Sequence, residues 1–199
     1  MKKSSIHMCN KQLRYLPGDN KDKLNEIIRV NHSGELGAIN IYQGQIAAIK
    51  HISRNKSKLL KILNDMYNSE VIHFEYFKSL IESYKIRPSL LTPVWSRLGF
   101  VVGYITGILG QKTAMTLTVG VETVIGKHYK EQLNILKNIT STSNVPYDLQ
   151  DKIAQFMSEE LEHLDIAINY KAEKMCSYFY FRKFIEISTR LAITLAKRI

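Results

Sequence analysis

Cysteine is nearly missing from this chain, and its scarcity argues against two classes of protein. Cys9 and Cys176 lie far apart and form no C-x-x-C pair, so neither a disulfide framework nor a thiolate zinc site is indicated. A reducing compartment is expected. The chain also has no G-x-G-x-x-G motif, so it builds no nicotinamide or flavin fold of its own.

Acidic residues are outnumbered, with 18 Asp and Glu against 28 Lys and Arg, for a net charge of +10. This excess favours an anionic partner, either nucleic acid or a lipid surface, unless it is only a lysine-rich composition. The basic N-terminus has no apolar signal core and no long presequence. We therefore predict a mature intracellular N-terminus, with a flexible tail over residues 1–21.

No apolar run is long enough to cross a membrane as a helix. Leu98–Gln111 contains no charged residue, but it falls short of the roughly 20 residues that a spanning helix needs. We predict an insert, about 88–111, that docks on a membrane with Trp95, Arg97 and Lys112 at the headgroup level. A buried connecting helix is the alternative. We assign the positive charge to this anionic surface and predict no nucleic-acid partner.

Long β patterns are also missing, whereas four long segments carry apolar residues at helical steps of three and four. Loop-forming residues separate these segments near 53–57, from Pro88 and at 140–146. Pro146 suits the first turn of the fourth helix, and a further helix follows from about Tyr180 to Arg198. The sequence therefore predicts an all-α, ferritin-like four-helix bundle over 22–199, with the insert between its second and third helices.

A carboxylate interrupts each apolar stripe near its middle. The four residues are Glu35, Glu70, Glu122 and Glu160. Burying an unpaired ionised glutamate is very unfavourable, and no Lys or Arg lies on the same stripes to neutralise it. Two divalent cations would balance the four negative charges.

Two of these glutamates begin an E-x-x-H motif, Glu70–His73 and Glu160–His163. Residues three apart on a helix project from one face and can share a metal, and chance predicts only roughly 0.4 such pairs here. The two halves also repeat, since Glu35 and Glu122 are each followed by Tyr at +7 and Gln at +10. One Glu plus one E-x-x-H from each half is the ligand set of ferritin-like di-metal bundles. The predicted ligands are Glu35, Glu70, His73, Glu122, Glu160 and His163.

Hard oxygen ligands with one imidazole per metal favour iron or manganese over zinc. By analogy with the fold, Glu35 and His73 hold one metal, Glu122 and His163 hold the other, and Glu70 and Glu160 bridge them. Four more polar residues lie near these ligands in the sequence. His128 and Tyr129 are candidates for orienting a ligand, with simple packing as the alternative, whereas Glu159 and Glu162 are expected to face solvent.

Five segments together resemble the demethoxyubiquinone hydroxylase family of ubiquinone biosynthesis. They are IIRVNHSGELGAINIYQGQ, EVIHFEYF, RPSLLTPVWSRLGF, VGVETVIGKHYKEQL and EELEHLDIAI. The resemblance covers roughly residues 24–199, and the family's six ligands fall on the same six residues. Members usually carry two adjacent acids where this chain has Glu122 and Thr123, but the ligand itself is present.

The resemblance implies a di-iron monooxygenase that uses O2 to hydroxylate the ring of a polyprenylated demethoxyubiquinol. Two electrons per turnover would come from an external reductant, for which NADH is one candidate. A lipid-binding accessory protein is an expected partner, and the expected location is peripheral, on the cytoplasmic face of a bacterial inner membrane. The alternatives are a ferritin-like ferroxidase or iron-storage protein, or a non-enzymatic membrane scaffold.

Overall fold

A computed structural model describes residues 18–52, 57–139 and 145–198. All regular structure in these residues is helical, as predicted. The helices are α1 (Gly18–Ile52), α2 (Ser57–Tyr84), α3 (Thr92–Leu109), α4 (Gln111–Ile139), α5 (Leu149–Asn169), the short 3-10 helix η2 (Ala172–Lys174) and α6 (Tyr178–Arg198).

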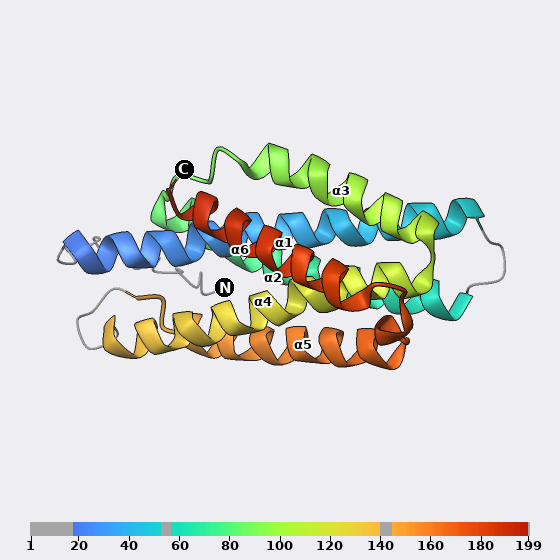
Figure 1. Ribbon diagram of the computed structural model, residues 1–199. Coiled ribbons are helices and arrows are strands. Elements are labelled where there is room, and N and C mark those ends of the chain that lie inside the picture. Colours follow the sequence, from blue (N-terminus) through green and yellow to red (C-terminus); the bar gives the residue numbers. More distant parts are fainter. Residues whose placement is uncertain (1–17, 53–56, 140–144, 199) are drawn as a thin grey trace, which may run out of the picture.

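Two helical hairpins form the bundle. Helices α1 and α2 pack together, as do α4 and α5, while α3 runs along α1 and α6 lies across α4 and α1 (Figure 1). Two clusters of buried apolar side chains fill the bundle, one around Phe77 and Phe156 and the other around Leu63 and Met115. Along each of the four bundle helices, the predicted carboxylate lies between residues of one cluster and residues of the other. Apolar packing therefore closes the bundle core on both sides of the carboxylates.

Helix α3, the predicted insert, is held close to α1 by glycines. A β-carbon added at Gly103 would overlap the carbonyl oxygen of Ile41, and one added at Gly44 would overlap the carbonyl oxygen of Phe100. Glycine therefore permits backbone-to-backbone packing at both positions. Gly110 then turns the chain directly from α3 into α4 with a φ of 109°, a conformation that other residues rarely adopt.

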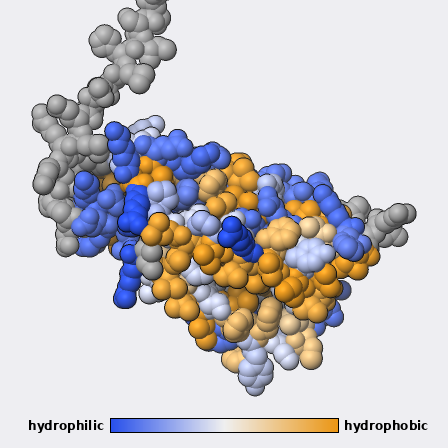
Figure 2. Space-filling model, turned by 90° about the horizontal axis from the view of Figure 1, so that it is seen from above, coloured by the Kyte–Doolittle hydropathy of each residue, from blue (hydrophilic) through white to orange (hydrophobic). Residues whose placement is uncertain are grey.

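The insert keeps an apolar outer face. The large exposed apolar side chains of this face are Val94, Leu98, Phe100, Val101, Ile105, Ile108 and Leu109 on α3, and Phe179, Tyr180, Phe184, Ile187 and Leu191 on α6. Figure 2 shows hydrophobic side chains gathered on the side of the molecule that α3 covers. Within the described ranges, no helix combines the length and the hydrophobicity that a membrane crossing requires.

Two sequence predictions need correction at helix ends. Residues 18–21, assigned to a flexible tail, form the first turn of α1, while residues 1–17 lie outside the described part of the chain. Pro146 does not lie in the first turn of α5, which begins at Leu149; instead its carbonyl oxygen accepts a hydrogen bond from the Leu149 N–H at 3.1 Å. The helix thus starts after a short turn.

Substituting Gly103 by Ala should destabilise the protein. The added methyl group would collide with the α1 backbone, and such overpacking costs about 1–3 kcal/mol. Gly34→Ala is the matched control, because its added methyl group meets no atom within 4 Å and should raise the free energy of unfolding by about 0.5–1 kcal/mol through helix propensity. Denaturant titration of both variants measures the difference, and equal stabilities would contradict the close packing of α3 on α1.

Candidate metal centre

Six buried side chains from the four bundle helices converge at one level. Glu35 comes from α1, Glu70 and His73 from α2, Glu122 from α4, and Glu160 and His163 from α5. They form two overlapping groups, each with its ligand atoms within 4.8 Å of one another. The first group is Glu35, Glu70, His73 and Glu160, and the second is Glu70, Glu122, Glu160 and His163. Glu70 and Glu160 therefore belong to both.

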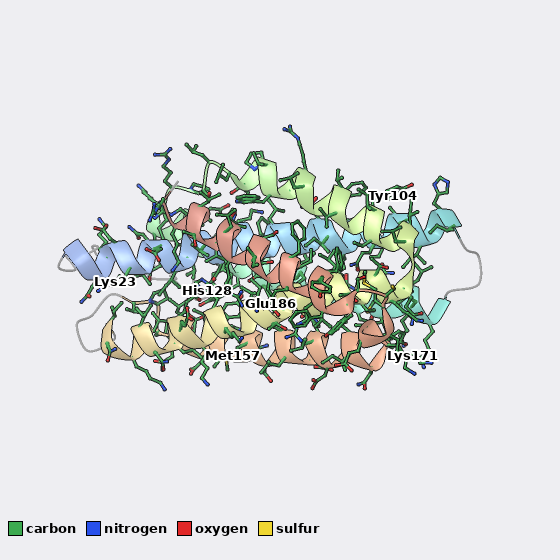
Figure 3. The ribbon with its side chains drawn as sticks, viewed as in Figure 1. Lys23, Tyr104, His128, Met157, Lys171 and Glu186 are labelled. Carbon is green, nitrogen blue, oxygen red and sulfur yellow. The ribbon has the colours of Figure 1, made fainter. Side chains whose placement is uncertain are left out.

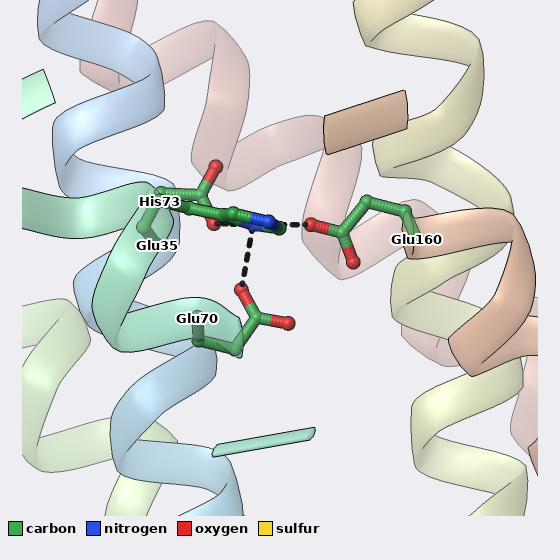
Figure 4. Close-up of side chains that lie close together, drawn as sticks. All are labelled: Glu35, Glu70, His73 and Glu160. Carbon is green, nitrogen blue, oxygen red and sulfur yellow. Dashed lines mark ion pairs between the residues drawn. The ribbon is translucent and has the colours of Figure 1, made fainter. Parts of the chain in front are cut away.

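The two shared glutamates each present one oxygen to each histidine. Nδ1 of His73 lies 3.2 Å from Oε1 of Glu160 and 3.7 Å from Oε2 of Glu70 (Figure 4). Nδ1 of His163 lies 3.2 Å from the other oxygen of each glutamate. The same Nδ1 of His73 is 3.7 Å from Glu35. This arrangement suits two metal ions bridged by two carboxylates.

Several of these atoms lack hydrogen-bond partners. Both carboxylate oxygens of Glu70 and Nδ1 of His73 are fully buried without a well-aligned hydrogen bond, although buried polar groups are nearly always paired. All six residues are at most 8 % exposed. Buried oxygen and imidazole donors that converge without partners of their own are what a cation requires, so the residues present fit a metal pair.

Two tyrosines hold the outer glutamates in a crossed pattern. Tyr42 on α1 donates a hydrogen bond to Glu122 on α4 at 2.9 Å, and Tyr129 on α4 donates a short hydrogen bond to Glu35 on α1. Tyr42 and Tyr129 occupy the same +7 position of the two repeats. Tyr129 thus touches a predicted ligand directly, whereas the importance of Tyr42 was missed although the repeat contained the signal.

Burial and mutual contacts shift the pKa values of the six side chains towards their protonated forms at several positions. Burial raises the pKa of Glu35 to about 8, and it raises the pKa of Glu122 well above the ordinary value. Burial opposes a charged imidazole, but contacts with Glu160 and Glu70 raise the pKa of His163 to about 11, and carboxylate contacts likewise raise the pKa of His73. Metal ions would displace these protons, since ligands bind metals in their deprotonated forms.

Glu159 was predicted to face solvent, and this prediction was wrong. Its Oε2 atom lies 2.6 Å from Nε2 of His73, the ring nitrogen that points away from the cluster, and its side chain is only 31 % exposed. Glu162, predicted to face solvent in the same way, is exposed. The helical pattern placed Glu159 off the apolar stripe and could not show that α2 lies against that side of α5.

His128 occupies a separate polar network. Its Nε2 accepts a hydrogen bond from Nε2 of Gln132 at 2.8 Å, and the Gln132 amide forms two hydrogen bonds with the amide of Asn31. Lys197 on α6 lies on the solvent side of this network and pairs with Glu26 at 3.3 Å. Figure 3 labels His128 on α4. Within the described chain, the hydrogen bond and the ion pair of His128 go to Gln132 and Glu131 and not to any of the six residues.

An apolar cavity of about 470 Å³ lies between α1, α4 and the two outer helices α3 and α6. Gly34 and Val121 line it, and each immediately precedes an outer glutamate, Glu35 or Glu122. Gly37 lines it as well, and an added β-carbon at Gly34 or Gly37 would meet only open space. The cavity therefore reaches α1 and α4 at the level of the candidate metal centre.

Comparison with known proteins agrees with this geometry. The family model described as ubiquinone biosynthesis protein COQ7 matches residues 22–196. The chain belongs to the COQ7 family. It is 35% identical over 176 residues to the NADPH-dependent 3-demethoxyubiquinone 3-hydroxylase of Dictyostelium discoideum, an alignment that covers 88% of this chain and 77% of the relative. Membership confirms the family inferred from the sequence motifs.

Two further relatives in the COQ7 family come from yeast and a bacterium. The 5-demethoxyubiquinone hydroxylase of Saccharomyces cerevisiae is 37% identical over 185 residues, which cover 88% of this chain and 78% of the relative. The 3-demethoxyubiquinol 3-hydroxylase of Rhodospirillum rubrum is 34% identical over 186 residues, which cover 92% and 83%. The matches thus extend over the bundle, α3 and α6 together.

The ring of His128 should titrate far below the ordinary histidine value. Burial and the nearby charge of Lys197 lower its pKa from 6.5 to about 4, so the folded protein holds the ring neutral. Between pH 6.5 and 4 the unfolded chain binds a proton that the folded chain does not. The free energy of unfolding therefore falls as the pH falls, by up to about 1.4 kcal/mol per pH unit.

Proton NMR titration of the His128 ring measures this pKa directly. His128→Gln keeps a neutral hydrogen-bonding side chain. As the pH falls from 7 to 5, its free energy of unfolding, measured by denaturant titration, should decrease less than that of the wild type. A His128 ring that titrates near pH 6.5 would contradict the prediction.

Proposed function

We propose that this protein is a di-iron monooxygenase that hydroxylates the ring of a polyprenylated demethoxyubiquinol. The observation that carries the proposal is the pair of overlapping Glu and His groups, which share Glu70 and Glu160 and lie at the same level of the bundle as an apolar cavity. The printed names of its relatives describe hydroxylases of demethoxyubiquinone or demethoxyubiquinol. Iron rather than manganese follows from the O2 chemistry that such a hydroxylation requires.

Each residue of the centre has a distinct part. Glu35 and His73 would hold one iron, Glu122 and His163 the other, and Glu70 and Glu160 would bridge the two. When bound, the iron pair supplies the activation of O2 and accepts the electrons that reduction of O2 requires. Tyr42 and Tyr129 keep the outer carboxylates in place through their hydrogen bonds, which limits the rearrangement of the site during turnover.

The cavity suits the substrate because it is almost wholly apolar and reaches Gly34 and Val121, the residues that precede the two outer glutamates. Its lining comes from α1, α3, α4 and α6, and it is large enough for a substituted ring with part of an isoprenoid chain. Apolar walls exclude water from the reacting ring. A ferroxidase or iron-storage protein has no need of such a cavity, so the cavity favours the lipid substrate.

The exposed apolar face of α3 and α6 is proposed to dock on the membrane that contains the substrate. Arg97 on α3 and Lys183 and Arg190 on α6 are exposed beside this face, and an anionic leaflet attracts such basic residues. We therefore propose a peripheral location. The particular membrane and a lipid-binding accessory partner remain predictions.

Electrons must come from outside, because the sequence has no dinucleotide-binding motif. The sequence suggested NADH as one candidate, and the printed name of the Dictyostelium relative specifies NADPH. We propose a reduced nicotinamide as the source of the two electrons, and parallel assays with NADH and NADPH distinguish the two donors.

Hydroxylation can be tested with iron-loaded protein, O2, a reduced nicotinamide and a short-chain demethoxyquinone. Mass spectrometry should detect a product heavier by one oxygen atom, labelled when 18O2 is supplied. Glu160→Ala removes a shared ligand and should lower the rate of product formation by more than about 100-fold. Loss of a residue that only supports a ligand typically costs about 10–100-fold.

Glu162→Ala is the control, because Glu162 is exposed on the same helix and should keep full activity. Equal product formation by Glu160→Ala and wild type would refute the proposal. Iron oxidation that accumulates mineral without any quinone product would instead support the ferroxidase.

Membrane docking can be tested by changing exposed apolar residues that do not line the cavity. Val101→Ser combined with Ile108→Ser removes two half-exposed side chains from α3. Burial of each of these side chains in lipid contributes on the order of 1 kcal/mol or more to the free energy of binding. Without them, binding to anionic phospholipid vesicles should weaken about 10–100-fold.

Ile72→Ser combined with Leu161→Ser is the matched control, because these two apolar residues on α2 and α5 are also exposed, by 63% and 45%. Vesicle cosedimentation gives the affinities. Equal losses for the two double variants would argue against docking through α3 and α6.

A further inference from the structure

The outer ring nitrogen of His73 has a carboxylate partner that is itself held in place. Oε2 of Glu159 lies 2.6 Å from Nε2 of His73 and accepts a hydrogen bond from Ser69 Oγ at 3.1 Å. Its other oxygen, Oε1, accepts a hydrogen bond from Nε2 of Gln155 at 2.8 Å. Both carboxylate oxygens of Glu159 are therefore engaged, and its position is fixed from three sides.

Among the described residues, no carboxylate pairs with Nε2 of His163 in the equivalent way, although the two halves of the chain repeat. Glu159 immediately precedes the Glu of the second E-x-x-H, and the residue at the same place in the first half is Ser69. Ser69 does not approach His163 but turns to Glu159. The ion pairs of His163 with carboxylates of the described chain all involve Nδ1. The repeat is thus broken at this one pair of positions.

The ring of His73 is also more tightly confined than the ring of His163. His73 is completely buried, and its ring centroid lies 4.0 Å from that of Phe156. The ring of His163 lies farther from its aromatic neighbour Tyr42, with centroids 6.2 Å apart. In the neutral ring, a carboxylate that accepts the Nε2–H favours the tautomer whose Nδ1 lone pair faces the cluster, and it makes this Nδ1 a stronger donor to a metal. This strengthening applies to His73 alone.

We infer that Glu159 is a positioning residue that makes the two metal positions unequal. The position formed by Glu35 and His73 binds its ion first and more tightly, and the position formed by Glu122 and His163 fills second. This inference rests on the proposed function, because it requires a metal pair. It goes further by assigning the order of loading and the residue that sets it.

Titration of the metal-free full-length protein with Co²⁺ tests the order of loading. The visible absorption of Co²⁺ bound to carboxylates and imidazole reports each step. Wild type should show two classes of site. In Glu159→Ala the tighter class should weaken about 10–100-fold, with the weaker class unchanged, and in Glu159→Gln the loss should be about 10-fold because the amide oxygen still accepts the Nε2–H.

Glu162→Ala is the matched control and should reproduce the wild-type curve, because this carboxylate is exposed on the same helix. Mössbauer spectra with one equivalent of 57Fe²⁺ give a second readout that simple destabilisation would not move. One quadrupole doublet is expected in the wild type and two in Glu159→Ala, as iron distributes over both positions.

Identical binding constants in Glu159→Ala and wild type, or an equal weakening of both classes, would overturn the inference. If Glu159→Ala does not fold, the Glu159→Gln titration decides, and an unchanged tighter class overturns the inference there. Wild-type protein that binds no Co²⁺ and no iron would defeat the proposed function itself. Two bound metals and normal hydroxylation with no effect at Glu159 would defeat only the inference.

Discussion

The need to neutralise four carboxylates inside one helical bundle is the constraint on which the rest of the structure depends. Glu35, Glu70, Glu122 and Glu160 come one from each bundle helix, and each is at most 4 % exposed. Apolar side chains close the bundle on both sides of this level. Because water cannot stabilise the charges there, histidines, tyrosine hydroxyl groups, protons or metal ions must do so.

The two halves of the chain meet this constraint by exchanging partners. The tyrosine two turns after each outer glutamate donates to the outer glutamate of the other half, so that α1 and α4 are joined twice by Tyr42 and Tyr129. The repeat is not perfect. Glu159 supports His73 alone, and α3 covers α1 whereas α6 lies across α4. Similar halves thus produce two positions with different surroundings.

Glycine occupies two positions in α1 that face the cavity, where a helix would otherwise favour alanine. Gly34 and Gly37 lie beside Glu35 in the middle of α1 and leave open space in the cavity, at a cost in helix stability of roughly 0.5–1 kcal/mol each. Gly103 and Gly44 serve a different purpose, since they let α3 approach α1 closely. The helix that forms one wall of the cavity is therefore firmly attached to the bundle, while its outer face remains apolar.

Helical periodicity in the sequence predicts the helices, their buried stripes and the six ligand residues, because this periodicity is local and charged residues on an apolar stripe stand out. The sequence motifs also resemble the demethoxyubiquinone hydroxylase family, and the match to the COQ7 family confirms this resemblance. The packing of the helices adds that Glu159 contacts His73, that Tyr42 contacts Glu122, and that an apolar cavity lies between α1, α4 and the outer helices α3 and α6. Periodicity tells which face of a helix is buried, but the rotation and spacing of neighbouring helices decide which atoms meet across that face. Glu159, one residue away from the stripe, is within reach of His73 for that reason.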